Sequence, residues 1–276
     1  MAWQNGEVLS EEQDNGLVFV YDLHSQLQRP KFNIPCPKAQ HIQVLPSPSG
    51  HAILVWSQNL NDSSGKSYYG EHSLQYIKIH KGKNRSFLPV FDNQVQDVAW
   101  LSDGSEFIVV SGQQPATATM YNSDGNPHFE FGKRFRNTIR ICPFNQCLML
   151  GGFGNINKGE MDFWNVQKQA EIGHGKAPCA TKLEWSACGR YLLTSVLYAR
   201  LKVDNGFKIT RANGTQIETT QAFDELHQVQ WQPHEAGELP RPNLNHLSKS
   251  VVKAESAKPK KFFKFGKGAG NSGAFQ

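Results

Sequence analysis

A short phrase recurs along the 276-residue chain: an apolar strand ends at a polar turn, and a second apolar strand follows. The clearest copies cover residues 96–110 and 182–193, and weaker copies begin at residues 42, 138 and 228. When the copies are aligned at the turn, the equivalent residues are Pro46, Trp100, Cys142, Trp185 and Trp231, which lie 54, 42, 43 and 46 residues apart. A period of roughly 40 to 50 residues with several short strands per repeat is typical of a β-propeller. Its blades are four-stranded sheets, which bury both faces only when they stack between two neighbours.

The composition agrees with an all-β fold. Apolar residues make up 38% of the chain and charged residues 19%, which indicates a globular rather than a disordered protein. Alternating or β-branched runs such as residues 17–21 and 73–79 are frequent, whereas helix-period apolar patterns are nearly absent. Turn pairs such as Asp124-Gly125 and Asn213-Gly214 separate consecutive predicted strands. We therefore predict a WD40-like β-propeller and do not expect a doubly wound α/β enzyme.

The repeat divides the chain into three parts. Residues 1–15 are expected to be disordered or a linker, residues 16–235 to form the β-propeller blades, and residues 236–276 to be a disordered tail rich in Lys and Phe. Within the middle part we expect two strands in 16–35, four blades in 39–89, 94–131, 136–173 and 180–220, and one more strand in 225–233.

The strand count leaves two arrangements open. Propeller rings close when strands from both ends of the chain complete one blade, so the strands in 16–35 and 225–233 could form a fifth blade of a small ring. Alternatively, the chain is a partial or open arc of about four to five blades from a larger propeller.

Several kinds of site are not expected. The cysteines, Cys36, Cys142, Cys147, Cys179 and Cys188, form no CxxC pair, so we interpret them as small buried side chains in a reducing compartment rather than as zinc ligands. Residues 1–7 lack the features of a signal peptide, and no apolar run is long enough to cross a membrane, which predicts a cytoplasmic protein without a membrane partner. The ten histidines are scattered, without an HExxH pair or a serine elbow, so we expect no catalytic residue, no metal and no cofactor. The remaining alternative is a propeller hydrolase, which would need acids and histidines gathered in a central channel.

The positive charge is concentrated in the C-terminal tail. Of the 29 basic and 24 acidic residues, eight basic residues and one acidic residue, Glu255, lie in 241–276, so this segment carries +7 and the rest of the chain −2. Lysines can neutralise phosphates, and the rings between them can stack on unpaired bases. We predict RNA or ribosome contacts by Lys258, Lys260, Lys261, Phe262, Phe263, Lys264 and Lys267. The alternative is a solubilising or nuclear-import-like basic tail.

A second pair of cations, Arg200 and Lys202, lies beside the turn-forming residues Asp204, Asn205 and Gly206. One interpretation is an RNA or ribosome contact on the rim of the propeller. The other, which we favour, is a structural hairpin in which Asp204 or Asn205 caps its own turn and Gly206 takes a positive φ. Both cations are retained as candidate contact residues.

Several separate phrases resemble the family of eukaryotic translation initiation factor 2A. The resemblance is carried by residues 152–155, 159–166, 184–194 and 200–209, and also by residues 67–71, 115–119, 129–132 and 229–233. It covers about residues 40–235 and keeps the order of the phrases. One phrase departs: Thr210-Arg211-Ala212 stands where the family continues with an aromatic pair, so the contact made by those rings is not expected here.

The resemblance implies a nine-bladed propeller, of which this chain holds roughly the C-terminal half. It further implies a non-catalytic translation initiation factor that binds the small ribosomal subunit and initiator tRNA or mRNA, together with other initiation factors. The alternative is a general WD40 protein-interaction scaffold without RNA contact, resembling the b subunit of initiation factor 3.

Overall fold

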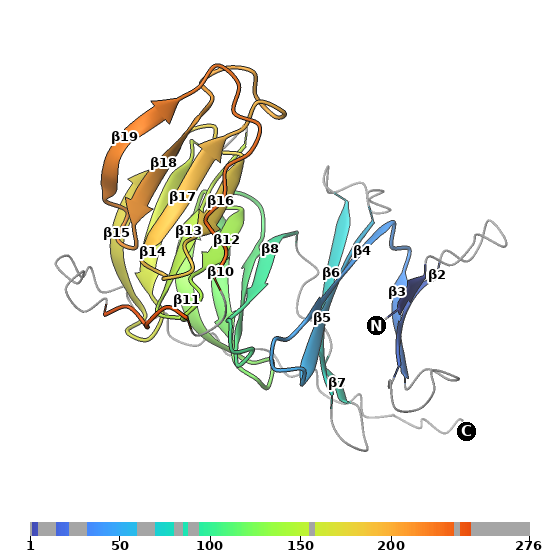
Figure 1. Ribbon diagram of the computed structural model, residues 1–276. Helices are drawn as coiled ribbons and strands as arrows, with labels where there is room; N and C mark the ends of the chain where they lie inside the picture. The colour runs from blue at the N-terminus through green and yellow to red at the C-terminus, as the bar shows by residue number, and fades with distance from the viewer. Residues whose placement is uncertain are drawn as a thin grey trace, which may run out of the picture.

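The computed structural model describes residues 2–4, 15–21, 32–59, 70–79, 85–87, 94–154, 158–234 and 238–243. These residues form five sheets, and every strand pairing in them is antiparallel (Figure 1). The first sheet contains β1 (Ala2–Gln4), β2 (Asn15–Val20) and β3 (Phe32–Pro37), and the second contains β4 (His41–Pro46), β5 (Ala52–Asn59), β6 (Glu71–Lys78) and β7 (Arg85–Phe87). The third contains β8 (Val95–Trp100), β9 (Phe107–Ser111), β10 (Ala116–Tyr121) and β11 (Pro127–Arg134). The fourth contains β12 (Thr138–Ile141), β13 (Cys147–Gly151), β14 (Glu160–Asn165) and β15 (Ala170–Lys176), and the fifth β16 (Lys182–Trp185), β17 (Tyr191–Val196), β18 (Gly206–Arg211) and β19 (Gln216–Ala222).

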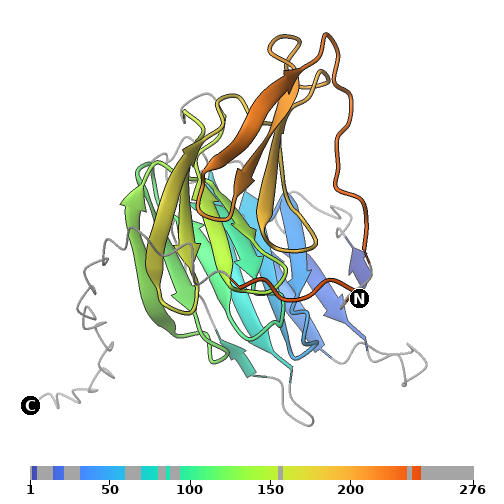
Figure 2. The same cartoon turned by 60° about the vertical axis from the view of Figure 1, so that its left-hand side comes forward.

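The sheets follow one another in chain order as a fan. Figures 1 and 2 show them face to face, with the first sheet at one end and the fifth at the other. Each four-stranded sheet is a meander, and the first strands lie side by side, since β12 contacts both β8 and β16. This is the radial arrangement of propeller blades, and the predicted open arc is therefore confirmed.

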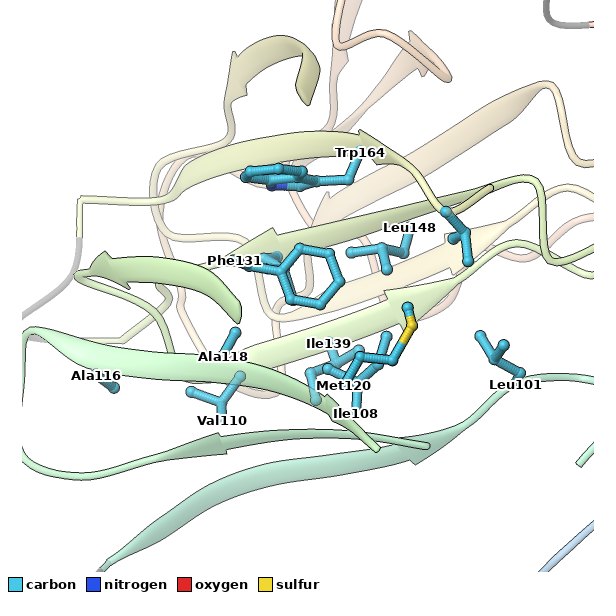
Figure 3. Close-up of a cluster of buried hydrophobic side chains, with 12 residues drawn as sticks. Leu101, Ile108, Val110, Ala116, Ala118, Met120, Phe131, Ile139, Leu148 and Trp164 are labelled. Carbon is cyan, nitrogen blue, oxygen red and sulfur yellow. The ribbon is translucent and has the colours of Figure 1, made fainter. Parts of the chain in front are cut away.

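The second strands of the third and fourth sheets are buried on both faces because a neighbouring sheet covers each face. All five residues of β9 and all five of β13 are buried. Leu148 and Leu150 of β13 join a cluster with the third sheet, whereas Cys147 and Met149 point to the other face and join a cluster with the fifth sheet. Figure 3 shows the former cluster, in which Trp164 lies beside Phe131 from the third sheet. The apolar core is thus divided into layers between successive sheets.

The turn after each first strand has the same hydrogen bond in four blades. The backbone N–H groups of Gly50, Gly104 and Gly189 donate to the carbonyls of Ser47, Leu101 and Ser186, at 2.8 Å each. Asn145 donates to Cys142 in the same way, at 3.0 Å. All four donors have a positive φ, between 55° and 74°, which explains why glycine or asparagine ends each turn.

The aligned tryptophans occupy matching places in the blades, as the repeat predicts. The indole Nε1 of each donates to a backbone carbonyl in the first strand of the preceding sheet: Trp100 to Leu45 at 3.0 Å, Trp185 to Arg140 at 2.9 Å, and Trp231 to Glu184 at 3.0 Å. The rings also contact aromatic neighbours such as Phe107 and Tyr191. Core packing is therefore the role of these rings.

Two features of the chain ends differ from expectation. Residues 225–233 form no strand, because the second strand with which a first strand would pair is missing beside them among the described residues. Ala2–Gln4, within the segment expected to be a linker, forms β1 and pairs with β2. The small closed ring is not formed, since the first and fifth sheets lie at opposite ends of the fan (Figure 1).

Candidate nucleic-acid interface

The loop between β17 and β18 carries the two candidate cations and is built around a buried asparagine. The side chain of Asn205 is only 3% exposed, and its Nδ2 donates to the carbonyls of Leu201, at 2.7 Å, and Val203, at 3.2 Å. Its Oδ1 accepts a hydrogen bond from the backbone N–H of Leu226, at 3.1 Å. Asn205 therefore ties the loop to itself and to the segment that follows β19, which supports the structural interpretation of the turn.

The positive φ of this turn is at Asp204, where it is 54°, and not at Gly206 as expected from the sequence. Asp is among the residues that tolerate this conformation. Gly206 instead begins β18 and pairs with Ala222, so it adopts strand geometry.

Arg200 and Lys202 are exposed on the outside of this loop. Lys202 Nζ lies 5.9 Å from the centre of the Tyr198 ring, within the range of a cation–π contact. The Tyr198 backbone N–H donates to the carbonyl of Leu226 at 2.8 Å, which fixes the base of the loop. The cations therefore project from a rigid support.

Exposed apolar side chains and acids lie beside these cations. Val203 is 60% exposed and Phe223 is 42% exposed, and Phe223 stacks on Phe207 with 6.0 Å between ring centres. The acidic side chains of Asp204, Asp224 and Glu225 are also exposed. We call these cations, apolar side chains and acids together the rim surface; its charge is mixed rather than uniformly positive.

The tail residues predicted to contact RNA lie outside the described residues. These are Lys258, Lys260, Lys261, Phe262, Phe263, Lys264 and Lys267. The last described segment, residues 238–243, passes the β16–β17 turn, where a Cβ added to Gly189 would lie 3.6 Å from Pro242 Cγ. The structure thus places Arg200 and Lys202 on one loop, and the last described residues before the tail lie beside the β16–β17 turn.

A charged cluster that the sequence did not reveal lies between the third and fourth sheets. Asp162, Glu171 and His174 bring ligand atoms within 4.8 Å of one another. Arg134 Nη1, however, lies 2.6 Å from both Asp162 Oδ1 and Glu171 Oε1, so a metal ion would have to displace a guanidinium already paired with both carboxylates. We therefore interpret the cluster as an ion-pair network that joins β11 to β14 and β15.

Arg136 forms the buried side of this network. Its side chain is 1% exposed, and its Nη2 lies 3.4 Å from Asp162 Oδ2, while Nε and Nη1 have no partner among the described residues. Burial lowers the pKa of Arg136 to about 10. Acids and a histidine on predicted strands were the only sequence signal for this cluster, and such charged residues are equally typical of a solvated face.

The cysteines are only partly as expected. Cys36, Cys142 and Cys147 are buried, but Cys179 is exposed in a turn, so the interpretation of all five as buried side chains is wrong. Cys142 and Cys147 flank one hairpin, and the backbone N–H of Cys147 lies 3.3 Å from Cys142 Sγ. A hydrogen bond from the Cys147 thiol lowers the pKa of Cys142 to about 7.

No helix among the described residues is long and apolar enough to cross a membrane.

The model of the family described as eukaryotic translation initiation factor eIF2A matches residues 37–229. Eukaryotic translation initiation factor 2A of Dictyostelium discoideum is 37% identical over 225 residues, which cover 82% of this chain and 36% of the relative. The b subunit of eukaryotic translation initiation factor 3 from Xenopus laevis is 28% identical over 160 residues, covering 56% of this chain and 23% of that protein.

A solved structure supports the fold. The crystal structure titled as that of the eukaryotic initiation factor superposes with a TM-score of 0.54 at 23% identity, covering 80% of this chain and 64% of that chain. The chain spans about a third of the length of the curated initiation factor 2A relatives that it matches.

Proposed function

Because the chain belongs to the family of eukaryotic translation initiation factor eIF2A, we propose that it acts in translation initiation as a non-catalytic adaptor that binds the small ribosomal subunit and initiator tRNA. The observation that carries the proposal is the match of the family model over residues 37–229, which include four of the five sheets. The proposed partners also include mRNA and other initiation factors, and the proposed location is the cytoplasm.

The two parts of the molecule have different roles in this proposal. The fan of sheets is rigid, because its apolar layers hold each sheet between its neighbours. It presents a fixed surface to a ribosomal protein or RNA. The tail supplies positive charge and reach, which increase the association rate with a polyanion and the effective concentration of the second contact.

The charge distribution supports a role for the tail in RNA contact. The segment 241–276 carries +7, while the rest of the chain carries −2. RNA phosphates would therefore be attracted mainly by the tail, where lysines stand beside three phenylalanines in residues 262–265. Arg200 and Lys202 would add local contacts, but the neighbouring acids make the rim surface the weaker candidate.

A substitution series tests the tail. Replacing Lys258, Lys260, Lys261, Lys264 and Lys267 by Gln removes five charges and keeps the length of the chain. We expect weaker binding to small ribosomal subunits and a slope of log affinity against log salt that is reduced by up to about four. The matched control replaces the same five residues by Arg, which keeps the charge and should keep both affinity and slope. Equal affinity and slope in all three proteins would reject the tail's role.

The second candidate function is a protein-interaction scaffold without RNA contact. It is favoured by the similarity to the b subunit of initiation factor 3 and by the mixed charge and exposed Phe223 of the rim surface, which fit a protein partner better than a polyanion. A scaffold of this kind would bind its partner with little dependence on salt and would bind neither free RNA nor tRNA. The salt slope therefore distinguishes the two functions.

A further inference from the structure

Two cysteines lie directly opposite each other at the turn between β12 and β13. The register that pairs Ile141 with Leu148 continues with Cys142 opposite Cys147, and the backbone N–H of Cys142 donates to the carbonyl of Cys147 at 3.0 Å. Opposite residues of an antiparallel pair point to the same face and have Cα atoms about 4.5 to 5.5 Å apart. A disulfide joins Cα atoms that are about 4.4 to 6.8 Å apart, so the backbone of this pair meets that requirement.

The other four-stranded sheets have no pair of thiols at the corresponding turn. The backbone bond that closes this turn runs there from Ser47 to Ala52, from Leu101 to Glu106 and from Ser186 to Tyr191, at 2.9 Å each. In the fifth sheet the Tyr191 N–H also donates to Ser186 Oγ, at 3.2 Å, just as the Cys147 N–H donates to Cys142 Sγ, at 3.3 Å. A serine can therefore fill the structural role of Cys142, and the fold itself does not require two thiols here.

The two thiols differ in acidity because one donates a hydrogen bond to the other. The bond from the Cys147 thiol lowers the pKa of Cys142 to about 7, although burial opposes it, and backbone N–H groups of Cys147, Phe144 and Gln146 add to the effect. The same contact, together with burial, raises the pKa of Cys147 well above its usual value. At neutral pH a large share of Cys142 is therefore thiolate, the form that reacts with oxidants, while Cys147 keeps its proton.

The pair lies next to the surface, although both side chains are buried. Pro143 is exposed and residues 144–146 are half-buried, so the turn that joins the two cysteines reaches the solvent. Cys147 Sγ also lies 4.0 Å from the carbonyl oxygen of Gly189, in the corresponding turn of the fifth sheet. Solvent-exposed turns open locally at a lower free energy than buried layers do, so a small oxidant can reach the thiols without unfolding of the sheets.

We propose that Cys142 and Cys147 form a reversible modification site, which hydrogen peroxide oxidises to a disulfide. The Cys142 thiolate attacks one peroxide oxygen, so that an S–O bond forms, the O–O bond breaks, and the other oxygen leaves as hydroxide. The Cys147 sulfur then attacks the sulfenic sulfur. The S–S bond forms, and the sulfenic oxygen leaves as hydroxide and takes up the Cys147 proton. With the proton that Cys142 had released, two thiols and one peroxide give one disulfide and two waters, and a thiol reductant reverses the change by exchange.

The test treats the full, folded chain with hydrogen peroxide, alkylates the remaining thiols and digests the product with trypsin. Cleavage after Arg140 and Lys158 leaves both cysteines in one peptide, residues 141–158. We expect this peptide to be unalkylated and lighter by two hydrogen atoms, and to carry two alkylated cysteines when the oxidised chain is reduced first. Two free thiols, two cysteines oxidised to sulfinic acid, or a disulfide from either one to Cys188 would each overturn the proposal.

Two variants separate the roles of the two thiols. Cys147→Ser keeps a hydroxyl beside Cys142 but removes the second thiol, so a sulfenic acid should accumulate at Cys142 and form an adduct with dimedone. Cys142→Ser introduces the residue that the fifth sheet has at this turn, and Cys147 should then stay reduced. The assignment is wrong if Cys147→Ser gives no adduct, or if Cys147 of the Cys142→Ser variant is oxidised as fast as the wild-type pair.

The pH dependence of the wild-type reaction gives a measurement that does not depend on the folding of a variant. The rate of disulfide formation should rise about tenfold per pH unit up to a pH of about 7 and then level off, because the share of Cys142 thiolate follows this course. A rate that continues to rise as steeply above that pH would indicate an ordinary thiol and would also overturn the proposal.

Discussion

The indole Nε1 of Trp231 donates a hydrogen bond to the carbonyl oxygen of Glu184, at 3.0 Å. Trp185 makes the same contact with Arg140, and Trp100 with Leu45, in each case one sheet back along the chain. The fourth blade has Cys142 at this position, and there Asp97 of the third sheet accepts a hydrogen bond from the backbone N–H of Ile139, at 2.7 Å. The first strands are thus joined by a polar contact at each of these steps, in addition to the apolar layers.

The indole donor of Trp185 contributes to stability separately from its ring. Trp185→Phe keeps most of the ring but removes the indole donor to the Arg140 carbonyl, so the free energy of unfolding should fall by about 0.5 to 1.5 kcal/mol. Trp185→Ala also removes the packing against Phe163 and should cost about 3 to 5 kcal/mol. Urea unfolding of the three proteins measures both steps. A Trp185→Phe variant as stable as the wild type would contradict a role for the indole donor.

Asp97 should stabilise the fold because its carboxylate accepts hydrogen bonds from two backbone N–H groups. Its Oδ1 accepts from Val98 at 2.9 Å and its Oδ2 from Ile139 at 2.7 Å, and an asparagine can replace only one of these acceptors. Asp97→Asn should therefore lower the free energy of unfolding at neutral pH by about 1 to 3 kcal/mol. Chemical denaturation measures the change, and a variant as stable as the wild type would show that the contact between the sheets is dispensable.

The same pair of proteins gives a pH dependence with a defined sign. Burial raises the pKa of Asp97 above its usual value, and the hydrogen bonds and Arg140 oppose this only in part. A folded-state pKa above the unfolded value means that the native state takes up the proton first, so the contribution of Asp97 to stability increases as the pH falls through that pKa. The stability of the wild type relative to Asp97→Asn should therefore grow from neutral pH towards pH of about 4. A difference that shrinks over this range would indicate a lowered pKa instead.

The two arginines of the ion-pair network should respond in opposite ways to replacement by Met. Arg134→Met leaves Asp162 and Glu171 without their main partner and should cost about 3 kcal/mol, the low end for a broken buried pair because Arg134 is 43% exposed. Arg136→Met removes a buried charge with two unpartnered nitrogens and should be neutral or slightly stabilising. Thermal unfolding compares them. A larger loss for Arg136→Met would show that its single contact with Asp162 is the important one.

Gly104 and Gly112 both have a positive φ, so alanine variants at the two positions distinguish the cost of backbone strain from the cost of a steric clash. A Cβ at Gly104, where φ is 69°, would lie 2.6 Å from the backbone nitrogen of Ser49 in the neighbouring blade, whereas one at Gly112, where φ is 93°, would meet nothing within 4 Å. Gly112→Ala should cost about 1 to 2 kcal/mol from backbone strain alone, and Gly104→Ala clearly more. Equal losses in denaturant unfolding would mean that the turns of adjacent blades are not in firm contact.

Much of the fold was predictable because each blade repeats the same pattern of strands, turn residues and buried positions. The aligned tryptophans, the turns ending at Gly50, Gly104 and Gly189, and the apolar second strands all carry a period in the sequence, and the structure confirms them. The strand expected at 225–233 was wrong because an apolar pattern says nothing of whether a partner strand is present. Whether a segment forms a strand depends also on whether a second segment lies beside it to pair with.

The candidate site was less predictable. The sequence suggested that Asp204 or Asn205 organises the loop, but only the structure shows that Asn205 also bonds to Leu226, twenty-one residues away. The network of Arg134 and Asp162 was missed because its members come from separate strands with no fixed spacing. The role of the tail lysines and phenylalanines stays a prediction, because those residues lie outside the described part of the chain.

We propose that this arc of stacked sheets serves as an adaptor on the small ribosomal subunit, and co-sedimentation of the unmodified chain with purified subunits measures that binding. We expect the chain to pellet with the subunits at about 50 mM salt and much less at about 200 mM salt, since phosphate contacts weaken as salt increases. Failure to pellet with the subunits at either salt concentration would contradict it.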